Sequence, residues 1–187
     1  MKKILALVLA LMMVLSAVAA LAEEGTPSIT PGDIETAVTN NPKVKVIVNA
    51  PDSEQTAAIK EQLLNGDEEA AIEYIKESVS GEAGSAVAAI IDKYTVDEVQ
   101  TQVIGAEPED LKELNSLTVT YTFNTKYDKG ETVYILIGIP GEGTDVEWVL
   151  LQGTADEEGN VTVTFDEALL AKLGTDEYVV VVISEKE

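Results

Sequence analysis

The carboxyl-terminal part of the chain alternates apolar and polar residues with a period of two, which is typical of β-strands with one buried face. Between 117 and 123, threonines alternate with Leu, Val, Tyr and Phe, and the same alternation returns between 161 and 165. Other apolar or β-branched runs, bounded by Gly, Pro, Asn or Asp, predict further strands. These lie at 44–48, 132–139, 146–150 and 178–183, the last being fully buried.

The middle of the chain has a helical period instead. Asp52 or Ser53 can cap a helix that ends near Leu64, and Asp67 can cap a second helix with apolar residues at helical spacing. An Ala- and Ile-rich third helix is expected over 83–94, and the capping-box spacing of 95–98 predicts a short helix through Ile104. A last short helix is expected from an Asp166 cap to Leu173, with Gly174 as its stop.

These elements predict an α+β protein built on an antiparallel immunoglobulin-like β-sandwich with a helical insertion after the first strand. Residues 117–187 would form the main β region, 44–48 its first strand, and 52–104 the helical insertion. Residues 23–42 are rich in Pro, Gly and Asn, which favours an irregular leader or spacer, with an irregular first strand as the alternative. The remaining 43–187 is long enough for one sizeable core, so we expect a single domain there.

The first 22 residues have the layout of a secretory signal peptide. Lys2 and Lys3 precede an unbroken apolar run, and small residues at Ala20 and Ala22 fit the cleavage rule before Glu23. An uncleaved anchor is the alternative, because the apolar run almost reaches the length of a membrane span. We expect cleavage and a secreted chain, extracellular or loosely attached to the cell wall of a bacterium.

Composition removes most familiar catalytic chemistry. The 187 residues include no His, Cys or Arg, so thiol and histidine nucleophile pairs, disulfides and the usual zinc, copper or haem ligands are excluded. The 34 acidic residues exceed the 12 lysines and give a net charge of −22, which disfavours nucleic acid and anionic membranes as partners. We read the acids as a solvated surface.

Paired carboxylates are the remaining route to an enzyme, as in glycosidases. Asp145 and Glu147 beside Trp148 are the first candidates, but we expect Trp148 in the sandwich core with both acids facing water. Calcium is the metal that suits carboxylates and carbonyls. The acidic run 156–160 has its glycine too early for a calcium loop and is interpreted as a hairpin turn.

Carbohydrate binding without turnover would use exposed aromatic side chains. The sequence has nine aromatic residues, most of which the core needs. Tyr121, Phe123, Trp148 and Phe165 share the parity of buried neighbours, and 126–130 is interpreted as an exposed loop. The candidates left for a sugar platform are Tyr74, Tyr94, Tyr127 and Tyr134.

The chain resembles a loose group of small exported proteins of unknown function from anaerobic Gram-positive bacteria, and the β-rich modules that end some of their surface proteins. The resemblance rests on the signal peptide, the acidic Ala-rich helices, the run 127–133, Trp148 and the run 160–165. It covers about two thirds of the chain with motifs of low specificity. It implies a non-catalytic surface or secreted role, and it transfers no functional residues.

We therefore expect a secreted, non-enzymatic protein with a binding or structural role at the bacterial cell surface or outside the cell. Its partner would be a protein or a carbohydrate, with no membrane contact after cleavage, and we expect no catalytic residue, cofactor or metal. The alternatives are a carboxylate-based hydrolase acting on extracellular polysaccharide and a calcium-stabilised adhesion module. The sequence leaves the oligomeric state and the strand order open.

Overall fold

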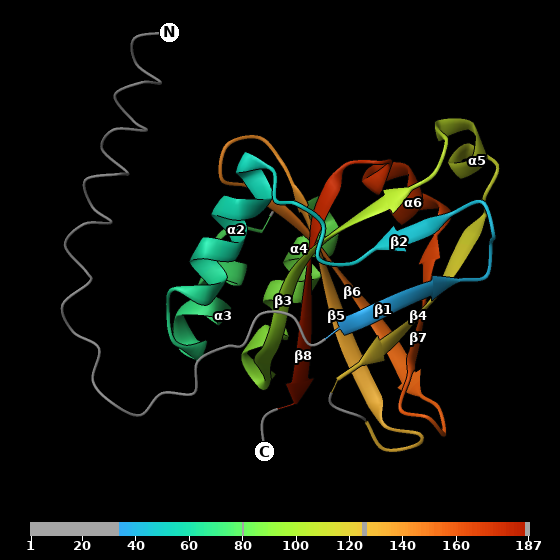
Figure 1. The fold of residues 1–187 in the computed structure, drawn as a ribbon. Helices are drawn as coiled ribbons and strands as arrows, with labels where there is room; N and C mark the ends of the chain where they lie inside the picture. Colours follow the sequence, from blue (N-terminus) through green and yellow to red (C-terminus); the bar gives the residue numbers. More distant parts are fainter. Residues whose placement is uncertain (1–33, 80, 125–126, 186–187) are drawn as a thin grey trace, which may run out of the picture.

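The structure, a computed structural model, describes residues 34–79, 81–124 and 127–185 (Figure 1). The predicted signal peptide at 1–22 and most of the predicted leader at 23–42 lie outside the described residues. Side chains are described throughout these ranges except at 81–83.

Antiparallel strands of the described chain form one eight-stranded sheet, in the order β1-β4-β7-β6-β5-β8-β3-β2. The alternation of apolar and polar residues places one face of each strand inside, as at Leu117, Val119, Tyr121 and Phe123. The strands are β1 (Ile34–Thr39), β2 (Lys45–Ile47), β3 (Tyr94–Gly105), β4 (Ser116–Phe123), β5 (Thr132–Pro140), β6 (Val146–Ala155), β7 (Val161–Asp166) and β8 (Glu177–Glu185).

The sheet curls until its two edge strands lie side by side, so that it forms a nearly closed barrel (Figure 1). A short turn joins β1 to β2, and within it the Thr39 hydroxyl donates to the carbonyl oxygens of Asn41, at 2.8 Å, and Val44. The described residues of β1 and β2 form no backbone ladder with each other. Side chains and the turn therefore close the barrel along this seam.

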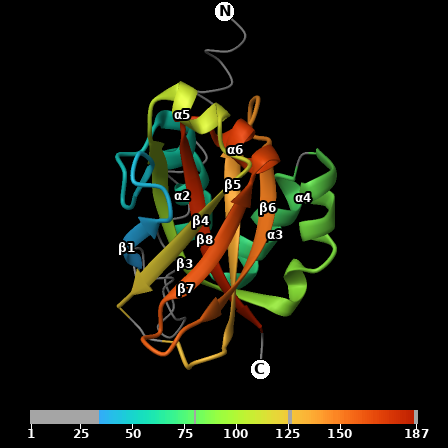
Figure 2. The same ribbon diagram turned by 90° about the vertical axis from the view of Figure 1, so that its right-hand side faces the viewer.

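Helices cover one side and one end of the barrel (Figure 2). The helices α2 (Glu54–Leu64), α3 (Glu68–Glu77) and α4 (Gly81–Ala88) pack outside β3, β8 and β6. The helices α5 (Pro108–Lys112) and α6 (Glu167–Leu173) lie together at one end of the barrel. As the sequence predicts, Ser53, Asp67 and Asp166 cap α2, α3 and α6 by accepting a hydrogen bond from a backbone N–H.

The sheet separates two hydrophobic cores. The inner core fills the barrel and includes Tyr121, Phe165 and Tyr178, with Leu170 of α6 closing the end. The outer core lies between the sheet and α2–α4, and Trp148 is its largest fully buried side chain. The Trp148 indole N–H donates to the Ser78 hydroxyl at 3.0 Å, so the buried polar atom of the indole has a partner.

The antiparallel α+β prediction is confirmed, whereas the immunoglobulin-like sandwich is not. A sandwich needs two sheets packed face to face, and here the strands belong to one sheet that curls on itself. Trp148 is buried, as expected, but it lies beneath the helices instead of between two sheets. Helices α2–α4 follow the strand predicted at 44–48, which is the second strand, β2, because β1 precedes it.

One local prediction is wrong. Residues 95–104 form strand β3 and not a helix. A bulge between Val96 and Glu98 shifts the register, and polar side chains then face the interior, so the sequence lacks the regular apolar alternation of a strand. Residues 34–39 form β1, which also carries a bulge, as in the alternative of an irregular first strand.

The other differences are in the helices. The predicted helix over 83–94 ends at Ala88 and is followed by a 3₁₀ turn, Ile91–Lys93. The short helix α5 was not predicted. No helix among the described residues is long and apolar enough to cross a bilayer.

Gly138→Ala tests the packing of the outer core. Gly138 pairs with Trp148, and an added Cβ would lie 2.6 Å from ring atom Cζ3. Because the ring is buried and hydrogen-bonded, it cannot move aside freely, and we expect the free energy of unfolding to fall by about 1–3 kcal/mol. Urea unfolding followed by circular dichroism measures this.

Thr164→Ala, at an exposed position of β7, is the control and should change stability by about 0.5 kcal/mol or less. Equal losses of stability in Gly138→Ala and Thr164→Ala would contradict the close packing of Trp148 on Gly138.

Candidate functional site

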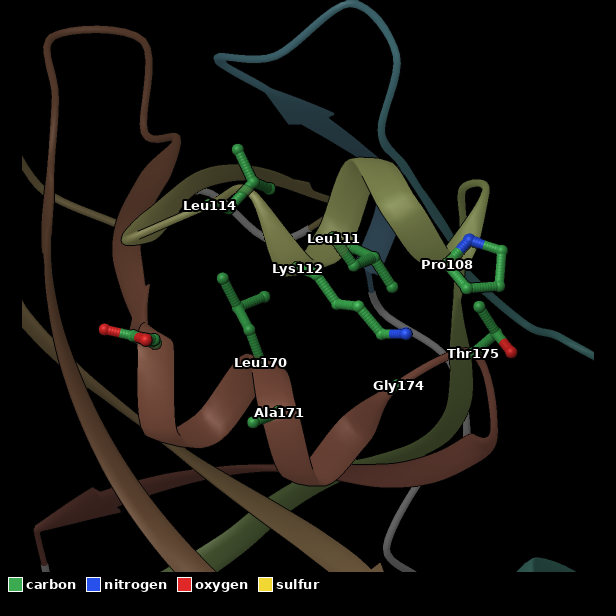
Figure 3. A pocket seen from close by; sticks show the side chains of 9 residues that line it. Pro108, Leu111, Lys112, Leu114, Leu170, Ala171, Gly174 and Thr175 are labelled. Carbon is green, nitrogen blue, oxygen red and sulfur yellow. The ribbon is translucent and has the colours of Figure 1, made fainter.

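A cleft lies between α5 and α6 at one end of the barrel (Figure 3). Its volume is about 320 Å³, near the lower limit of small-molecule sites. Most of its lining is apolar, with a charged side chain from each helix. The lining residues are Pro108, Leu111, Lys112, Leu114, Glu167, Leu170, Ala171, Gly174 and Thr175.

Local sequence fixes both walls of this cleft. Pro108 begins α5, where its fixed φ suits the first helical turn, and Leu111 turns inward. Leu169, Leu170 and Leu173 anchor α6 in the inner core. Gly174 ends α6 with φ +53°, a conformation that favours glycine. The cleft is thus formed by two short helices held on a packed barrel.

Two opposite charges lie at different places along this cleft. The exposed Lys112 side chain extends across it towards Gly174 and Thr175 (Figure 3). Glu167 is the first residue of α6, and a rise of 1.5 Å per residue places it about 10 Å along the helix from Gly174. Neither Lys112 nor Glu167 forms an ion pair with another described residue. Both charges therefore remain available to a ligand.

A second hollow of about 300 Å³ lies on the other side of the turn between α6 and β8. Its lining is more polar and includes Ser53, Gln55, Asp176, Glu177 and Lys172. Lys172 forms an ion pair with Glu147, which lies outside the lining. Asp176 is exposed and Glu177 is partly exposed. No described carboxyl group in this hollow is buried.

A chain of buried polar side chains runs along β3 inside the barrel. Glu98 Oε1 accepts from the Ile34 N–H at 2.8 Å and from the Gln100 side-chain amide at 2.6 Å. The Gln102 amide donates to Gln100 Oε1 at 3.3 Å, and Gln102 Oε1 accepts from the Tyr121 hydroxyl at 2.9 Å. All these side chains are at most 2% exposed. The chain occupies the interior, so it is part of the scaffold.

Sequence reasoning missed this polar chain, although a signal was present. Glu98, Gln100 and Gln102 alternate along the sequence, as the inward residues of a strand do. Polar residues at those positions concealed the strand, because burial is normally inferred from apolar side chains.

The pair considered for acid catalysis does not form a site. Trp148 is buried, Asp145 is exposed, and Glu147 is half-buried and forms its ion pair with Lys172. The two acids therefore lie in different environments, and Glu147 has a cationic partner.

In the acidic turn at 156–160, the Asp156 carboxylate is hydrogen-bonded within the turn, whereas Glu157 pairs with Lys129. Asp156 Oδ1 accepts from the backbone N–H groups of Glu158 at 2.8 Å and Asn160 at 2.9 Å, and these contacts hold the pKa of Asp156 below its usual value. Gly159 has φ +79°, as expected for a hairpin turn. Among the described residues no group of three His, Cys, Asp or Glu side chains is placed to hold a metal ion.

The four tyrosines considered for sugar binding do not share one surface. Tyr94 and Tyr134 contact edge to face with ring centroids 5.1 Å apart, and both pack on the outer core, as does Tyr74. Tyr127 contacts Phe123 at 5.1 Å and packs against the inner core. Of the loop 126–130, residue 126 lies outside the described residues, and Gly130 hydrogen-bonds to Ala155.

No protein-family model, curated protein or solved structure matches this chain. The suggested relationship to small exported proteins therefore stays a prediction.

Stability should fall at alkaline pH because of two tyrosines in the barrel. Burial raises the pKa of Tyr121 and Tyr178 well above the ordinary value near 10. Above that pH the unfolded chain releases these protons while the folded chain keeps them, so each tyrosine lowers the free energy of unfolding by about 1.4 kcal/mol per pH unit. Below pH 10 their contribution is constant.

Urea unfolding between pH 9 and 11.5 measures how the free energy of unfolding changes with pH. Tyr121→Phe should reduce this slope by the contribution of one proton, about 1.4 kcal/mol per pH unit. Absorbance at 295 nm should show tyrosinate from the two residues only as the protein unfolds. If both phenols ionise near pH 10 while circular dichroism still shows the native fold, the buried environment is contradicted.

Proposed function

We propose that this chain is an exported, non-catalytic binding protein that holds its ligand in the α5–α6 cleft. The observation that carries the proposal is the combination of an apolar lining with Lys112 and Glu167, two charges that have no ion-pair partner among the described residues. Ligand sites typically join apolar walls to a few placed polar groups.

The arrangement of the barrel supports a site at its end. Large side chains of Tyr121, Phe165 and Tyr178 fill the interior, which leaves the rim as the place where a ligand can be enclosed. Because α5 and α6 are anchored by buried leucines, the cleft stands on a rigid scaffold. Such a scaffold lowers the entropy cost of binding.

Export is part of the proposal and is supported by the sequence of residues 1–22. Removal of this segment would give a mature chain, residues 23–187, that is released or loosely held at the cell wall. A strongly acidic surface would keep that chain soluble.

A carboxylate-based hydrolase is the second candidate, because the second hollow holds two acids, Asp176 and Glu177, beside Lys172. General-acid catalysis by a carboxyl group relies on burial or on a second acid across the substrate. Asp176 and Glu177 are adjacent in sequence and partly or fully exposed. A calcium-stabilised adhesion module has less support, because the Asp156 oxygens already accept hydrogen bonds.

Blocking the cleft should abolish binding. Ala171 is exposed on the cleft wall, so Ala171→Trp should fill the space without disturbing the core. We expect small apolar probes such as isobutyramide to shift the backbone amide resonances of Lys112, Ala171 and Thr175 in the mature chain. The variant should weaken this binding at least tenfold.

Thr162→Trp is the matched control, since it adds the same ring at an exposed position of β7. It should bind the probes as the unmodified chain does. Probe-induced shifts that are spread over the surface, or that survive in Ala171→Trp, would exclude the cleft as the site.

The hydrolase alternative predicts a different result. We expect the mature chain to release no reducing sugar from a panel of cell-wall and plant polysaccharides, because the acids of the second hollow lack the environment of a catalytic pair. Reducing-end assays measure this. Sugar release that disappears in Asp176→Asn or Glu177→Gln, but persists in the surface variant Asp145→Asn, would replace the binding proposal with an enzymatic one.

A further inference from the structure

We infer that the ligand of the α5–α6 cleft is a short apolar peptide with both termini free, about three residues long. Its carboxylate would pair with Lys112 and its ammonium group with Glu167. This inference rests on the proposed function and adds the chemical class of the ligand.

The two charges select for a ligand that is charged at both ends. Lys112 Nζ offers an ammonium group at the Gly174 end of the cleft (Figure 3). Glu167 offers a carboxylate at the start of α6. A charge that loses water on binding is costly unless the ligand supplies the opposite charge. A ligand with only a negative charge would pair with Lys112 but would place its apolar part against the Glu167 carboxylate. A neutral sugar would pair with neither charge.

The spacing of Glu167 and Gly174 along α6 sets the length of the peptide. Gly174 follows Glu167 by seven residues, a rise of about 10 Å along the helix axis, and the Lys112 side chain extends towards Gly174 (Figure 3). An extended peptide spans about 3.3–3.6 Å per residue, so three residues cover the same distance. A single zwitterionic amino acid is too short to reach both ends.

The wall between the charges sets the character of the side chains. Pro108, Leu114 and Ala171 contribute apolar surface, and Leu111 and Leu170 form the floor. Burial of apolar ligand groups there is favourable. The volume of about 320 Å³ suits small and medium side chains.

Lys112 differs from most of the other described lysines because it has no ion pair among the described residues. Lys43, Lys60, Lys76, Lys129 and Lys172 each pair with a carboxylate. In a chain with a net charge of −22, such a cation crossing an apolar cleft is suited to a carboxylate from outside the chain.

Isothermal titration of the mature chain with Leu-Ala-Leu tests the inference. The free tripeptide should bind, and N-acetylation or C-amidation should each weaken binding about three- to tenfold, because each removes one charge-assisted contact. Leu-Leu and Leu-Ala-Leu-Ala-Leu should bind more weakly than the tripeptide, since their termini do not match the two charges.

Two substitutions assign each end of the peptide. Lys112→Met should lose the preference for the free carboxylate but keep the preference for the free amine, and Glu167→Gln should do the reverse. Lys93→Met is the control, because Lys93 is also exposed and has no ion pair among the described residues, and it should keep both preferences.

Three results would overturn the inference. Capped and free peptides that bind equally, or preferences that Lys112→Met and Glu167→Gln leave unchanged, would show that the charges do not select the termini. In both cases isobutyramide would still shift the cleft resonances, and the proposed function would stand. If neither the peptides nor isobutyramide binds in the cleft, the proposed function fails as well.

Discussion

Closure of the sheet along the seam between β1 and β2 is the constraint on which the rest of the structure depends. The described residues of β1 and β2 share no ladder, and those of β1 form a ladder only with β4 on its other side, so another contact must join β1 to the β2–β3 edge of the sheet. The Glu98 carboxylate supplies it by accepting from the Ile34 N–H, which joins β3 to β1 from inside. A buried carboxylate is costly without hydrogen bonds, and the Gln100 amide beside it provides another. The polar side chains of β3 thus lie in the interior at the open seam, where Glu98 joins β3 to β1.

The same curvature gives the sheet two different outer halves. One half is covered by α2–α4, and Trp148 fits there because Gly138 on the neighbouring strand leaves room for its ring. The other half, on β4 and β7, exposes threonines, whose branched side chains suit a strand and whose hydroxyls bond across it, as between Thr120 and Thr162. The helices on one outer half create the outer core, while the other outer half stays polar. A single sheet therefore carries two cores, one inside the barrel and one beneath the helices.

Much of this fold could be predicted from local patterns. Alternating residues located β4 and β7, and the caps Ser53, Asp67 and Asp166 located three helices. The closure could not be predicted, because it depends on contacts such as Glu98 with Ile34 that are 64 residues apart. The cleft was missed for the same reason: Lys112 and Glu167 are ordinary surface residues in sequence, and only the packing of α5 beside α6 places them on one site.

The filled barrel also explains why the candidate site lies at its end. An eight-stranded barrel has an interior just wide enough for its own side chains, and Tyr121 and Tyr178 occupy that space with their hydroxyls bonded to Gln102. A ligand inside would have to displace satisfied hydrogen bonds and packed rings. At the rim, Leu170 and Leu173 bury one side of α6 and leave its other side beside α5. Because the same helix closes the core and forms the cleft wall, the stability of the barrel holds the cleft in shape.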